Sequence, residues 1–463
     1  MSTFITQNNK VLNLIDLERQ ISINAIHHSE LHFSTCFELA KNILNNYGSA
    51  NQVKVLTNLL FAKSKKAYLI SLISFYNTRA DDKIVKVVHS FDNISAKILG
   101  ERGILVETGE KAGASLLDAR LTTLLIKVII HKLFRLHFFV FSSFKTAKKS
   151  LIRSWVEVSY TLYRDKYPDS VILVYPFGLS LGRQKRYFTM LKANGFKYLL
   201  IGVPYTFRNY IAILFSGKQA RDLKILKFEY DAYQKHSFEL GKFNATQIYT
   251  TDEFEAAGIV LYENLLTNKV NVQNRAHGIG QYCPFVNYSD FVLYNQAQID
   301  YYKRNNTLIN YKIDIGLKPA IEPVDLEDGA QKCIVYLHCP AEILNMVFEA
   351  DRQIELLKRL KIYADERGIK CIIKIHPNTS EKEMERLNSQ FQVPCIRSIA
   401  DIINSYRPTF VHFLSTAYFD FFKLGNFYFY TDTYYNPKDY FGDDILTFSF
   451  ENLNTTLDRE FGI

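Results

Sequence analysis

Short apolar runs alternate with polar or amphipathic stretches over the middle of the chain. Residues 181–194, before Gly195, have helical spacing, and a second helix is predicted to extend through Tyr302. Residues 251–255 have the composition of a helix start. This order of elements predicts parallel β-α-β units. Strands are predicted over 170–175, 198–203, 247–250 and 291–294.

The same alternation is clearest after residue 330 and continues almost to the end of the chain. Two such regions predict an α/β protein with two Rossmann-like lobes. Ligands of open parallel sheets bind beyond the carboxyl ends of the strands, so polar residues there are the first site candidates. Strands are predicted over 333–337, 370–375, 409–414 and 427–430, and helices over 342–366, 381–391, 399–405 and from Ser415 onward.

The pattern divides the chain into three regions without an internal repeat or a low-complexity linker. Residues 1–165 are predicted to be a mainly helical or mixed extension that contacts a membrane surface or the acceptor. Residues 166–318 are predicted to form the N-terminal Rossmann-like lobe, and residues 330–463 are predicted to form the C-terminal Rossmann-like lobe.

Composition indicates a folded protein, since 48% of the 463 residues are apolar and 22% are charged. The net charge of +9 is a mild excess over this length. It permits attraction to anionic membranes or phosphate-bearing substrates, but a nucleic-acid partner is not expected without a concentrated basic face. The six cysteines form no C-x-x-C pair, which favours reduced, buried thiols.

One segment departs from the rest in charge: residues 119–156 contain eight Lys or Arg and no Asp or Glu, among many apolar residues. Such a segment can lie at an anionic membrane interface. The alternative is a helical hairpin with a solvated basic face, packed on its own domain. The N-terminus lacks the apolar core of a secretory signal, and no run approaches the about 18 residues that span a bilayer. A cytoplasmic location is therefore expected, with the inner face of the membrane as a peripheral contact.

Three short motifs lie where ligands are expected, and each has a structural alternative. Ser or Thr at a helix start can hold phosphate, although it can also serve only as a cap. A histidine after a strand can donate to phosphate or to a carbonyl in a turn. A histidine beside glycines can act as a general base, or the glycines can serve turn geometry alone. The motifs are His277-Gly278-Ile279-Gly280, Lys374-Ile375-His376-Pro377 and Ser415-Thr416.

The order of these motifs on an α/β pattern resembles the GT-B glycosyltransferases of bacterial surface-polysaccharide synthesis. The group includes sialyl-, polysialyl- and Kdo-type transferases with an HP motif and a following Ser/Thr motif. It also includes the related CDP-glycerol and CDP-ribitol polyol-phosphate transferases, which carry an HG motif as well. The resemblance covers roughly residues 170–435 and does not extend to residues 1–165.

The resemblance implies roles for the lobes and for these residues. The lobe of residues 166–318 would lie on the acceptor side, and the lobe of residues 330–463 would hold the nucleotide of the donor. Lys374, His376, Pro377 and Ser415-Thr416 would bind the donor's nucleotide phosphate. His277 would face the acceptor, with Gly278 and Gly280 shaping its loop. Neither a metal nor a cofactor is expected, and inversion is the expected outcome at the sugar carbon.

The general base stays open at this point, because the acidic motif of the sialyltransferases is displaced. Glu327-Asp328-Gly329 has the right letters but precedes the first strand of the C-terminal lobe, which indicates an interlobe turn. The base is therefore His277, or a carboxylate such as Asp252 or Glu253. Weaker candidates for ligand contact are Arg183, Lys185, Arg186, Arg208, Lys218, Tyr434, Tyr435 and Tyr440, whereas Asp443-Asp444 indicates a surface turn.

Three functions remain under consideration. The first is a glycosyltransferase that moves a sugar, preferably from a CMP-sugar, onto a capsule, lipooligosaccharide or O-antigen glycan. The second is a polyol-phosphate transferase of the CDP-glycerol type, which the HG motif favours. The third is a non-catalytic protein that binds a nucleotide sugar or a glycan.

Overall fold

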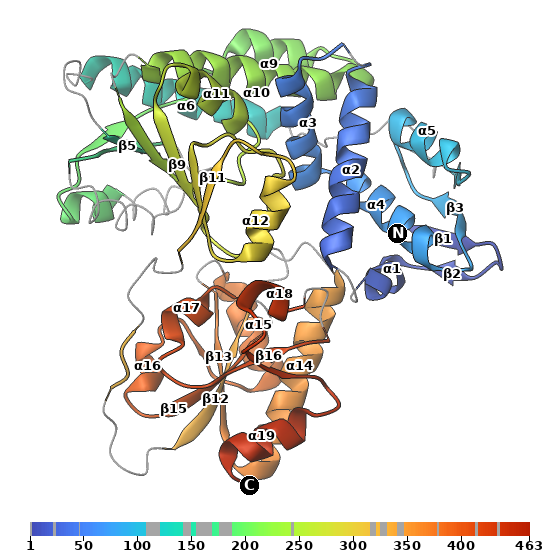
Figure 1. Ribbon diagram of the computed structural model, residues 1–463, viewed down its shortest axis with the longest axis vertical. Coiled ribbons are helices and arrows are strands. Elements are labelled where there is room, and N and C mark those ends of the chain that lie inside the picture. The colour runs from blue at the N-terminus through green and yellow to red at the C-terminus, as the bar shows by residue number, and fades with distance from the viewer. Residues whose placement is uncertain are drawn as a thin grey trace. The chain divides into compact units, whose positions relative to one another are not determined.

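The computed structural model of the chain describes residues 2–21, 25–45, 47–107, 121–141, 150–153, 169–175, 188–241, 245–314, 321–324, 331–339, 347–376, 379–412, 415–432 and 436–463. It divides into two compact units (Figure 1). The first unit comprises Met1–Lys10, Ser29–Asn77 and Asp81–Asp314. The second comprises Val11–His28, Thr78–Ala80 and Ile315–Ile463.

Helices predominate in the N-terminal part of the chain, as the sequence predicts, and a small sheet accompanies them. In this sheet β1 is antiparallel to β3, and β4 is parallel to β3. The start of α3 is fixed by a capping box, in which Ser49 and Gln52 exchange hydrogen bonds. The elements are β1 (Thr3–Thr6), α2 (Ala25–Ile43), α3 (Ala50–Lys63), α4 (Lys65–Arg79), β3 (Ile84–Val88), α5 (Asn93–Glu101) and β4 (Leu105–Glu107).

The centre of the first unit is a parallel sheet of seven strands, here named sheet B. Its order is β11-β10-β9-β8-β5-β6-β7. Read from β7, with the strands numbered along the chain, this is 3-2-1-4-5-6-7. This is the doubly wound order, and its direction reverses between β5 and β8. The strands are β5 (Ser150–Arg153), β6 (Val171–Val174), β7 (Tyr198–Leu200), β8 (Gln247–Thr250), β9 (Asn271–Arg275), β10 (Asp290–Leu293) and β11 (Asn310–Ile313).

The first strand of sheet B, β5, lies at Ser150–Arg153, which is before residue 166, the predicted start of this lobe. It pairs with β6 on one side and with β8 on the other. All four residues of β6 are buried, as expected for a parallel strand that is covered on both faces. Ser150–Arg153 is therefore an inner strand of sheet B.

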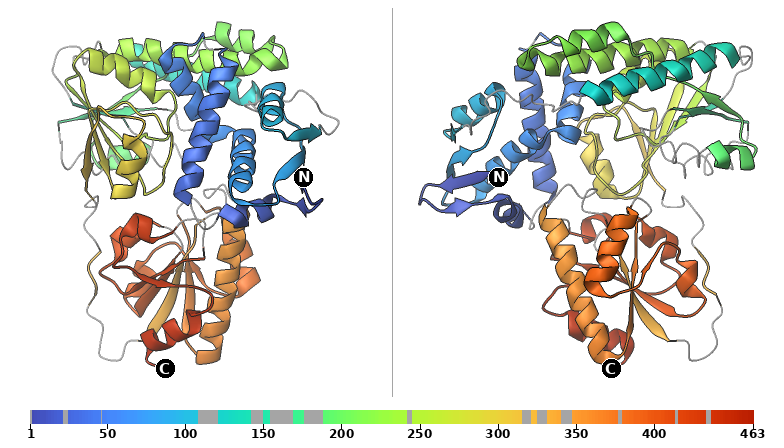
Figure 2. Two further views of the ribbon diagram at one scale, coloured as in Figure 1. Left: turned by 45° about the vertical axis from the view of Figure 1, so that its right-hand side comes forward. Right: turned by 180° about the vertical axis from the view of Figure 1, so that it is seen from behind.

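Helices α6, α9 and α10 lie side by side against this sheet (Figures 1 and 2). Gly202, after β7, permits the approach of α6, because a Cβ atom there would lie 1.9 Å from the carbonyl oxygen of His131. Lys127 and Arg135 of α6 form ion pairs with Glu229 and Glu239 of α10. The helices of this part are α6 (Leu121–Phe141), α9 (Phe207–Leu214), α10 (Lys218–Gly241), α11 (Gly258–Thr267) and α12 (Gln296–Lys303).

The second unit contains a parallel sheet of six strands, here named sheet C. Its order is β14-β13-β12-β15-β16-β17, which is again 3-2-1-4-5-6 along the chain. The reversal lies between β12 and β15. The strands are β12 (Lys332–Leu337), β13 (Lys370–Lys374), β14 (Cys395–Ile396), β15 (Arg407–His412), β16 (Phe427–Tyr430) and β17 (Leu446–Phe448).

Helices cover both faces of sheet C (Figure 2). Leucines of α14, α15 and α19 pack with Ile334 and Tyr336 on one face, and α16 and α17 pack with Val335 and Phe410 on the other. Helix α1 contacts α14. The remaining elements are β2 (Val11–Leu12), α1 (Leu14–Ile21), α14 (Val347–Arg367), α15 (Glu381–Phe391), α16 (Ala400–Ile403), α17 (Ala417–Phe421), α18 (Lys438–Phe441) and α19 (Leu453–Phe461).

The predicted α/β class with two Rossmann-like sheets is confirmed by these strand orders. Within the described ranges, none of the helices combines the length and the apolar character needed to cross a bilayer. The six cysteines are free thiols, and four of them are buried.

Candidate functional site

The polar residues expected near the end of β8 meet those that follow β9. Asp252 and Glu253 lie two and three residues after the end of β8, and His277 lies two residues after the end of β9. The helix start predicted over 251–255 is wrong, because α11 begins at Gly258. The carboxylates of this segment take partners at the edge of sheet B instead of capping a helix.

His277 and Glu253 form a hydrogen-bonded dyad. His277 Nδ1 lies 2.6 Å from Glu253 Oε1, and the backbone N–H of His277 donates to the same oxygen at 2.8 Å. Glu253 has no exposed side-chain surface, whereas His277 is 29% exposed. A carboxylate on Nδ1 favours the tautomer in which Nδ1 carries the proton and Nε2 is free to accept one. The Tyr282 hydroxyl lies 3.2 Å from that Nε2 atom.

The loop that follows His277 is held by α12. The side-chain amide of Gln298 donates to the carbonyls of Gly278 and Gly280, at 2.8 and 3.0 Å. A Cβ atom on Gly280 would lie 2.7 Å from the ring of Tyr282, so glycine leaves room for that ring. Tyr301 donates to the Tyr282 carbonyl at 2.8 Å. Gly280 and Tyr301 therefore help to set the position of Tyr282 beside the dyad.

Asp252 has a different environment from that of Glu253. It is ion-paired with Arg153 at the end of β5, and the Tyr262 hydroxyl donates to it. Arg153 is fully buried, also pairs with Glu255, and lies 5.1 Å from the centroid of the Tyr175 ring. Burial raises the pKa of Tyr175 to about 12, so this tyrosine is neutral at physiological pH. Asp252 thus neutralises a buried cation at the reversal point of sheet B.

This position of Arg153 corrects one part of the sequence interpretation. Arg153 was counted among the basic residues of the 119–156 segment that could face a membrane. It lies in the core instead, and Lys127 and Arg135 of the same segment pair with carboxylates of α10. Of the described basic residues in this segment, Lys132 is the one that lies on the exposed side.

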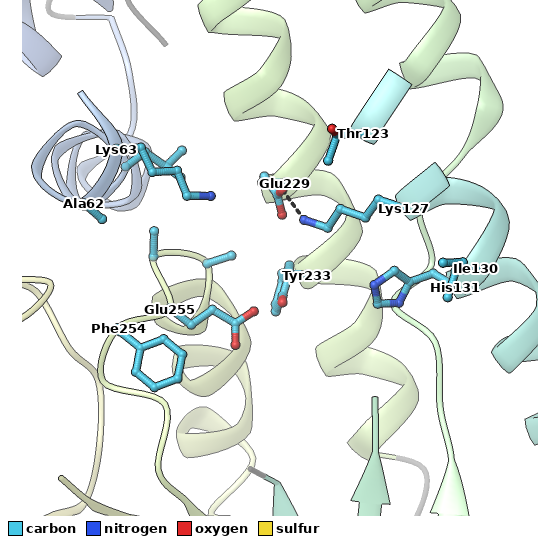
Figure 3. Close-up of a pocket in the computed structure, with 13 residues that line it drawn as sticks. Ala62, Lys63, Thr123, Lys127, Ile130, His131, Glu229, Tyr233, Phe254 and Glu255 are labelled. Carbon is cyan, nitrogen blue, oxygen red and sulfur yellow. Dashed lines mark hydrogen bonds and ion pairs between the residues drawn. The ribbon is translucent and has the colours of Figure 1, made fainter. Parts of the chain in front are cut away.

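A cavity of about 390 Å³ opens beside the segment that follows β8 (Figure 3). Lys127 and Glu229 form an ion pair of 2.5 Å on one side of it, and Lys63 of α3 extends toward them. Phe254 lies on the opposite side, and its ring centroid is 5.1 Å from that of His277. The lining residues are Leu59, Ala62, Lys63, Thr123, Lys127, Ile130, His131, Glu229, Tyr233, Phe254, Glu255, Ala256 and Ala257.

The second group of candidates lies at the carboxyl edge of sheet C. Lys374 ends β13, and its ammonium donates to the Ile375 carbonyl at 2.9 Å. His376 follows, and its carbonyl accepts from the Thr379 N–H at 2.9 Å, which closes a turn. Burial lowers the pKa values of both side chains, and the charge of Lys374 lowers that of His376 further. Pro377 lies outside the described residues.

Ser415 and Thr416 precede α17, as expected, but the helix is shorter than predicted. It covers five residues, Ala417–Phe421, and its N-cap residue Thr416 makes no capping bond with its side chain. The Ser415 hydroxyl, one residue earlier, accepts from the Ala417 N–H at 3.2 Å. A helix of this length contributes little dipole field. The hydroxyls and N–H groups are therefore the groups that this turn could offer to a phosphate.

The weaker candidates that the structure describes, Arg208, Lys218 and Tyr440, lie on three different helices. Tyr440 is buried in α18, Arg208 is exposed on α9, and Asp443-Asp444 lies in an exposed turn as expected. Lys218 is the first residue of α10. The candidates Arg183, Lys185, Arg186, Tyr434, Tyr435 and the segment Glu327-Asp328-Gly329 lie outside the described residues.

Sequence reasoning missed the residues that support the dyad and those that surround Asp252. Gln298 and Tyr301 lie on a helix that carries no motif, and Arg153 ends a run of only two apolar residues. Among the described residues, no group of three or more His, Cys, Asp or Glu is arranged to hold a metal ion.

Comparison with known proteins shows similarity to a solved structure but to no protein family or curated sequence. No protein-family model matches the chain, and no curated protein is significantly similar to it. The crystal structure of MurG from Acinetobacter baumannii matches with a TM-score of 0.38 and 9% sequence identity, over 68% of this chain and 90% of that chain. A TM-score this low does not establish a shared fold, so the fold assignment rests on the strand orders of sheets B and C.

Proposed function

We propose that the protein is a glycosyltransferase that moves a sugar from a nucleotide-activated donor onto a bacterial surface glycan. The observation that carries the proposal is the Glu253–His277 dyad, a base with a fixed tautomer, next to a cavity at the edge of a doubly wound sheet. A second sheet of the same order presents Lys374, His376 and Ser415 at its carboxyl edge. A base and a phosphate-binding set are what transfer from a sugar nucleotide requires.

The proposed reaction is a single displacement at the anomeric carbon. His277 Nε2 takes the proton of the acceptor hydroxyl, which occupies the place that the Tyr282 hydroxyl holds in the structure. The acceptor oxygen forms the new bond to the anomeric carbon as the bond to the phosphate oxygen breaks. Glu253 stabilises the imidazolium that forms, and the leaving nucleotide keeps the electron pair. Inversion follows from one displacement, and no metal takes part in the proposed scheme.

The donor and the acceptor are assigned to different units in this proposal. Lys374, His376 and the Ser415-Thr416 turn bind the nucleotide phosphate, and we favour a CMP-sugar on the resemblance of the motifs. The cavity beside Phe254 takes the acceptor end of a capsule, lipooligosaccharide or O-antigen glycan. Its aromatic rings and its carboxylates Glu229 and Glu255 suit the apolar faces and the hydroxyls of a sugar.

We further propose that the protein works on an anionic membrane surface at the cytoplasmic face. Phe207, Ile211, Leu214 and Phe215 are exposed along one side of α9 and its end, and Phe215 is 81% exposed. Leu133 of the neighbouring α6 is 60% exposed. The basic residues Lys132 and Arg208 lie among them, and residues 170–221 contain no Asp or Glu. Apolar side chains with basic neighbours suit an anionic lipid surface.

The second candidate function is a polyol-phosphate transferase of the CDP-glycerol type. The histidine of the dyad belongs to an HG motif, which that group also carries. The same residues would then direct attack at phosphorus instead of carbon. Analysis of the product distinguishes the two functions, because one yields a phosphodiester and the other a glycosidic bond.

The test begins with a thermal-shift panel of CMP, CDP, UDP and GDP on the wild type and on His376→Ala. A ligand that binds the folded state raises the melting temperature according to its concentration relative to its Kd. We expect one nucleotide to stabilise the wild type and to lose that effect in His376→Ala. No shift with any of the four would overturn the donor site.

The matched activity test uses the donor that the panel selects, with a glycan acceptor. His277→Ala should bind the nucleotide like the wild type but lose turnover by at least about 100-fold, because a general base contributes that much. Nucleotide binding without turnover in the wild type would support the third function, a non-catalytic binding protein.

A further inference from the structure

Sheet C reverses its strand order at β12, and the residue that directly follows this strand is His338. β13, which ends at Lys374, lies on one side of β12, and β15, which leads to Ser415, lies on the other. Leu337 pairs with Lys374 in one neighbour and with His412 in the other, so the three strands end level. His338 therefore lies between the two segments that are proposed to hold the donor phosphate.

The imidazole of His338 has an unused polar atom. Its Nε2 is buried and has no hydrogen-bond partner among the described residues. Thr379 Oγ1, in the turn after His376, is likewise buried without a partner in the described part of the chain. Buried polar atoms are nearly always paired in native proteins, so two such atoms at one sheet edge indicate a ligand with hydrogen-bond acceptors.

The charges around His338 favour an anion. Of its neighbours, Glu383 and Arg386 pair with each other at 2.7 Å, so their charges offset, and His376 is uncharged at neutral pH because burial lowers its pKa. The remaining positive charge is that of Lys374, whose carbonyl accepts from the His338 N–H at 3.0 Å. Its ammonium donates to the Ile375 carbonyl and forms no ion pair with a carboxylate in the described part of the chain. Burial lowers the pKa of His338 to about 4, so at neutral pH the ring is uncharged and carries one N–H. That N–H can donate to a phosphate oxygen.

A second buried histidine, at the end of β15, serves as a comparison. Both ring nitrogens of His412 lack a partner in the described structure, and the residue has no exposed surface. The rings of Phe427, Phe429 and Phe441 lie 5.9, 4.4 and 5.9 Å from it. Such apolar walls offer nothing to a phosphate, so His412 belongs to the core.

We propose that His338 is a further donor-binding residue, whose Nε2–H donates to a phosphate oxygen of the nucleotide between the His376 and Ser415 segments. This inference rests on the proposed function, because it assumes that a nucleotide binds at the edge of sheet C. The residue after β12 would then make the central contact of the donor site. Because this contact is to the phosphate, it should not distinguish one nucleotide base from another.

The experiment measures Kd values by calorimetry for CMP, CDP, UDP and GDP and for the nucleosides cytidine, uridine and guanosine. The variants are His338→Leu, His338→Gln and, as the matched control, His412→Leu. We expect His338→Leu to raise the Kd of the nucleotide that binds best by about tenfold, the usual effect of a lost hydrogen bond to a charged group. His338→Gln keeps a hydrogen-bond donor and should recover part of the affinity. It also provides the test of the contact if His338→Leu does not fold. His412→Leu should leave the Kd unchanged.

The outcomes separate this inference from the proposed function. If no nucleotide binds the wild type, the proposed donor site fails first, and the inference with it. If the wild type binds and both His338 variants bind equally well, only the inference is overturned. Equal losses for nucleoside and nucleotide would also overturn it, since they indicate a structural effect and not a phosphate contact.

Discussion

Two adjacent carboxylates, Asp252 and Glu253, have different roles because their partners differ. Asp252 neutralises a buried arginine, and Glu253 orients a histidine that reaches the surface. Removing one partner of an isolated buried ion pair costs about 3–5 kcal/mol, and the lower end applies here because Arg153 keeps Glu255 as a partner. Changing the charge on a partner of a catalytic histidine affects mainly the reaction.

We therefore expect Asp252→Asn to affect mainly the stability of the fold and Glu253→Gln to affect mainly turnover. Asp252→Asn should lower the free energy of unfolding by about 3 kcal/mol, because Arg153 loses one carboxylate. Glu253→Gln should stay folded and lose turnover by at least about 100-fold. Denaturant unfolding and product formation, measured on both variants, test this. A fully active Glu253→Gln would rule out the dyad as the base.

His412 allows a prediction about acid stability. Burial lowers its pKa to about 3, below the ordinary value of 6.5. When the pH falls below about 6.5, the unfolded chain takes up a proton that the folded protein does not, so stability is lost progressively toward acid pH. One pH unit below that value, this costs about 1.4 kcal/mol.

His412→Leu should remove this contribution, so the variant should lose about 1.4 kcal/mol less than the wild type between pH 7.5 and 5.5. Phe429→Leu is the control, since it alters the same aromatic cluster without changing a titratable group. Chemical unfolding at the two pH values measures the difference. An unchanged pH dependence in His412→Leu would contradict the assignment.

Among the elements, α6 depends most clearly on a single glycine. A side chain at position 202 would collide with the His131 carbonyl of α6. Overpacking of this kind costs about 1–3 kcal/mol. Gly202→Ala should therefore lower the melting temperature by several degrees. Gly217→Ala is the matched control, because a Cβ atom there meets nothing within 4 Å, and it should have little effect. Equal melting temperatures for the two variants would refute this account of α6 packing.

The elements also show what the sequence can predict. Four of the six strands of sheet C, β12, β13, β15 and β16, were predicted, because parallel strands that are covered on both faces form continuous apolar runs. The ranges 381–391 and 427–430 match α15 and β16, whereas the short outer strands β14 and β17 were missed. β9, with the sequence NVQNR, was missed. Its Asn274 is fully buried but bonds to the backbone of Asp252, and this partner is invisible in the local pattern.

The candidate site follows the same division. His277, Glu253 and His376 could be named as candidates from the sequence because they stand just beyond strands or beside glycines, which is a local signal; their roles stay predictions. Gln298, Arg153 and His338 could not be identified, because their importance comes from contacts with distant parts of the chain or from strand order. Local patterns predict which residues lie at the edge of a sheet, but not which of them bond to one another.

For the whole molecule, the proposed membrane surface gives a test that needs no substrate. The protein should co-sediment with vesicles that contain phosphatidylglycerol, and less with vesicles of phosphatidylcholine alone. The double variant Leu214→Ser/Phe215→Ser should lose most of this binding, and Phe238→Ser on α10, where the phenylalanine is 71% exposed, should keep it. The proposal of a membrane surface would be overturned if the wild type did not bind the vesicles, or if both variants bound them equally. If the wild type and Phe238→Ser form dimers in solution and the double variant does not, the α9 face is instead a contact with a second copy of the chain.

One side of helix α6 lines the cavity, and another side is exposed on the surface. Lys127, Ile130 and His131 line the cavity, whereas Lys132 and Leu133 are exposed on the side that is proposed to meet lipid. Occupancy of the cavity and attachment to a bilayer are then two binding equilibria that share one rigid element. If lipid contact changes the affinity of the cavity by some factor, a ligand in the cavity must change the affinity for lipid by the same factor. The vesicle assay, repeated with a saturating acceptor glycan, would measure that factor directly.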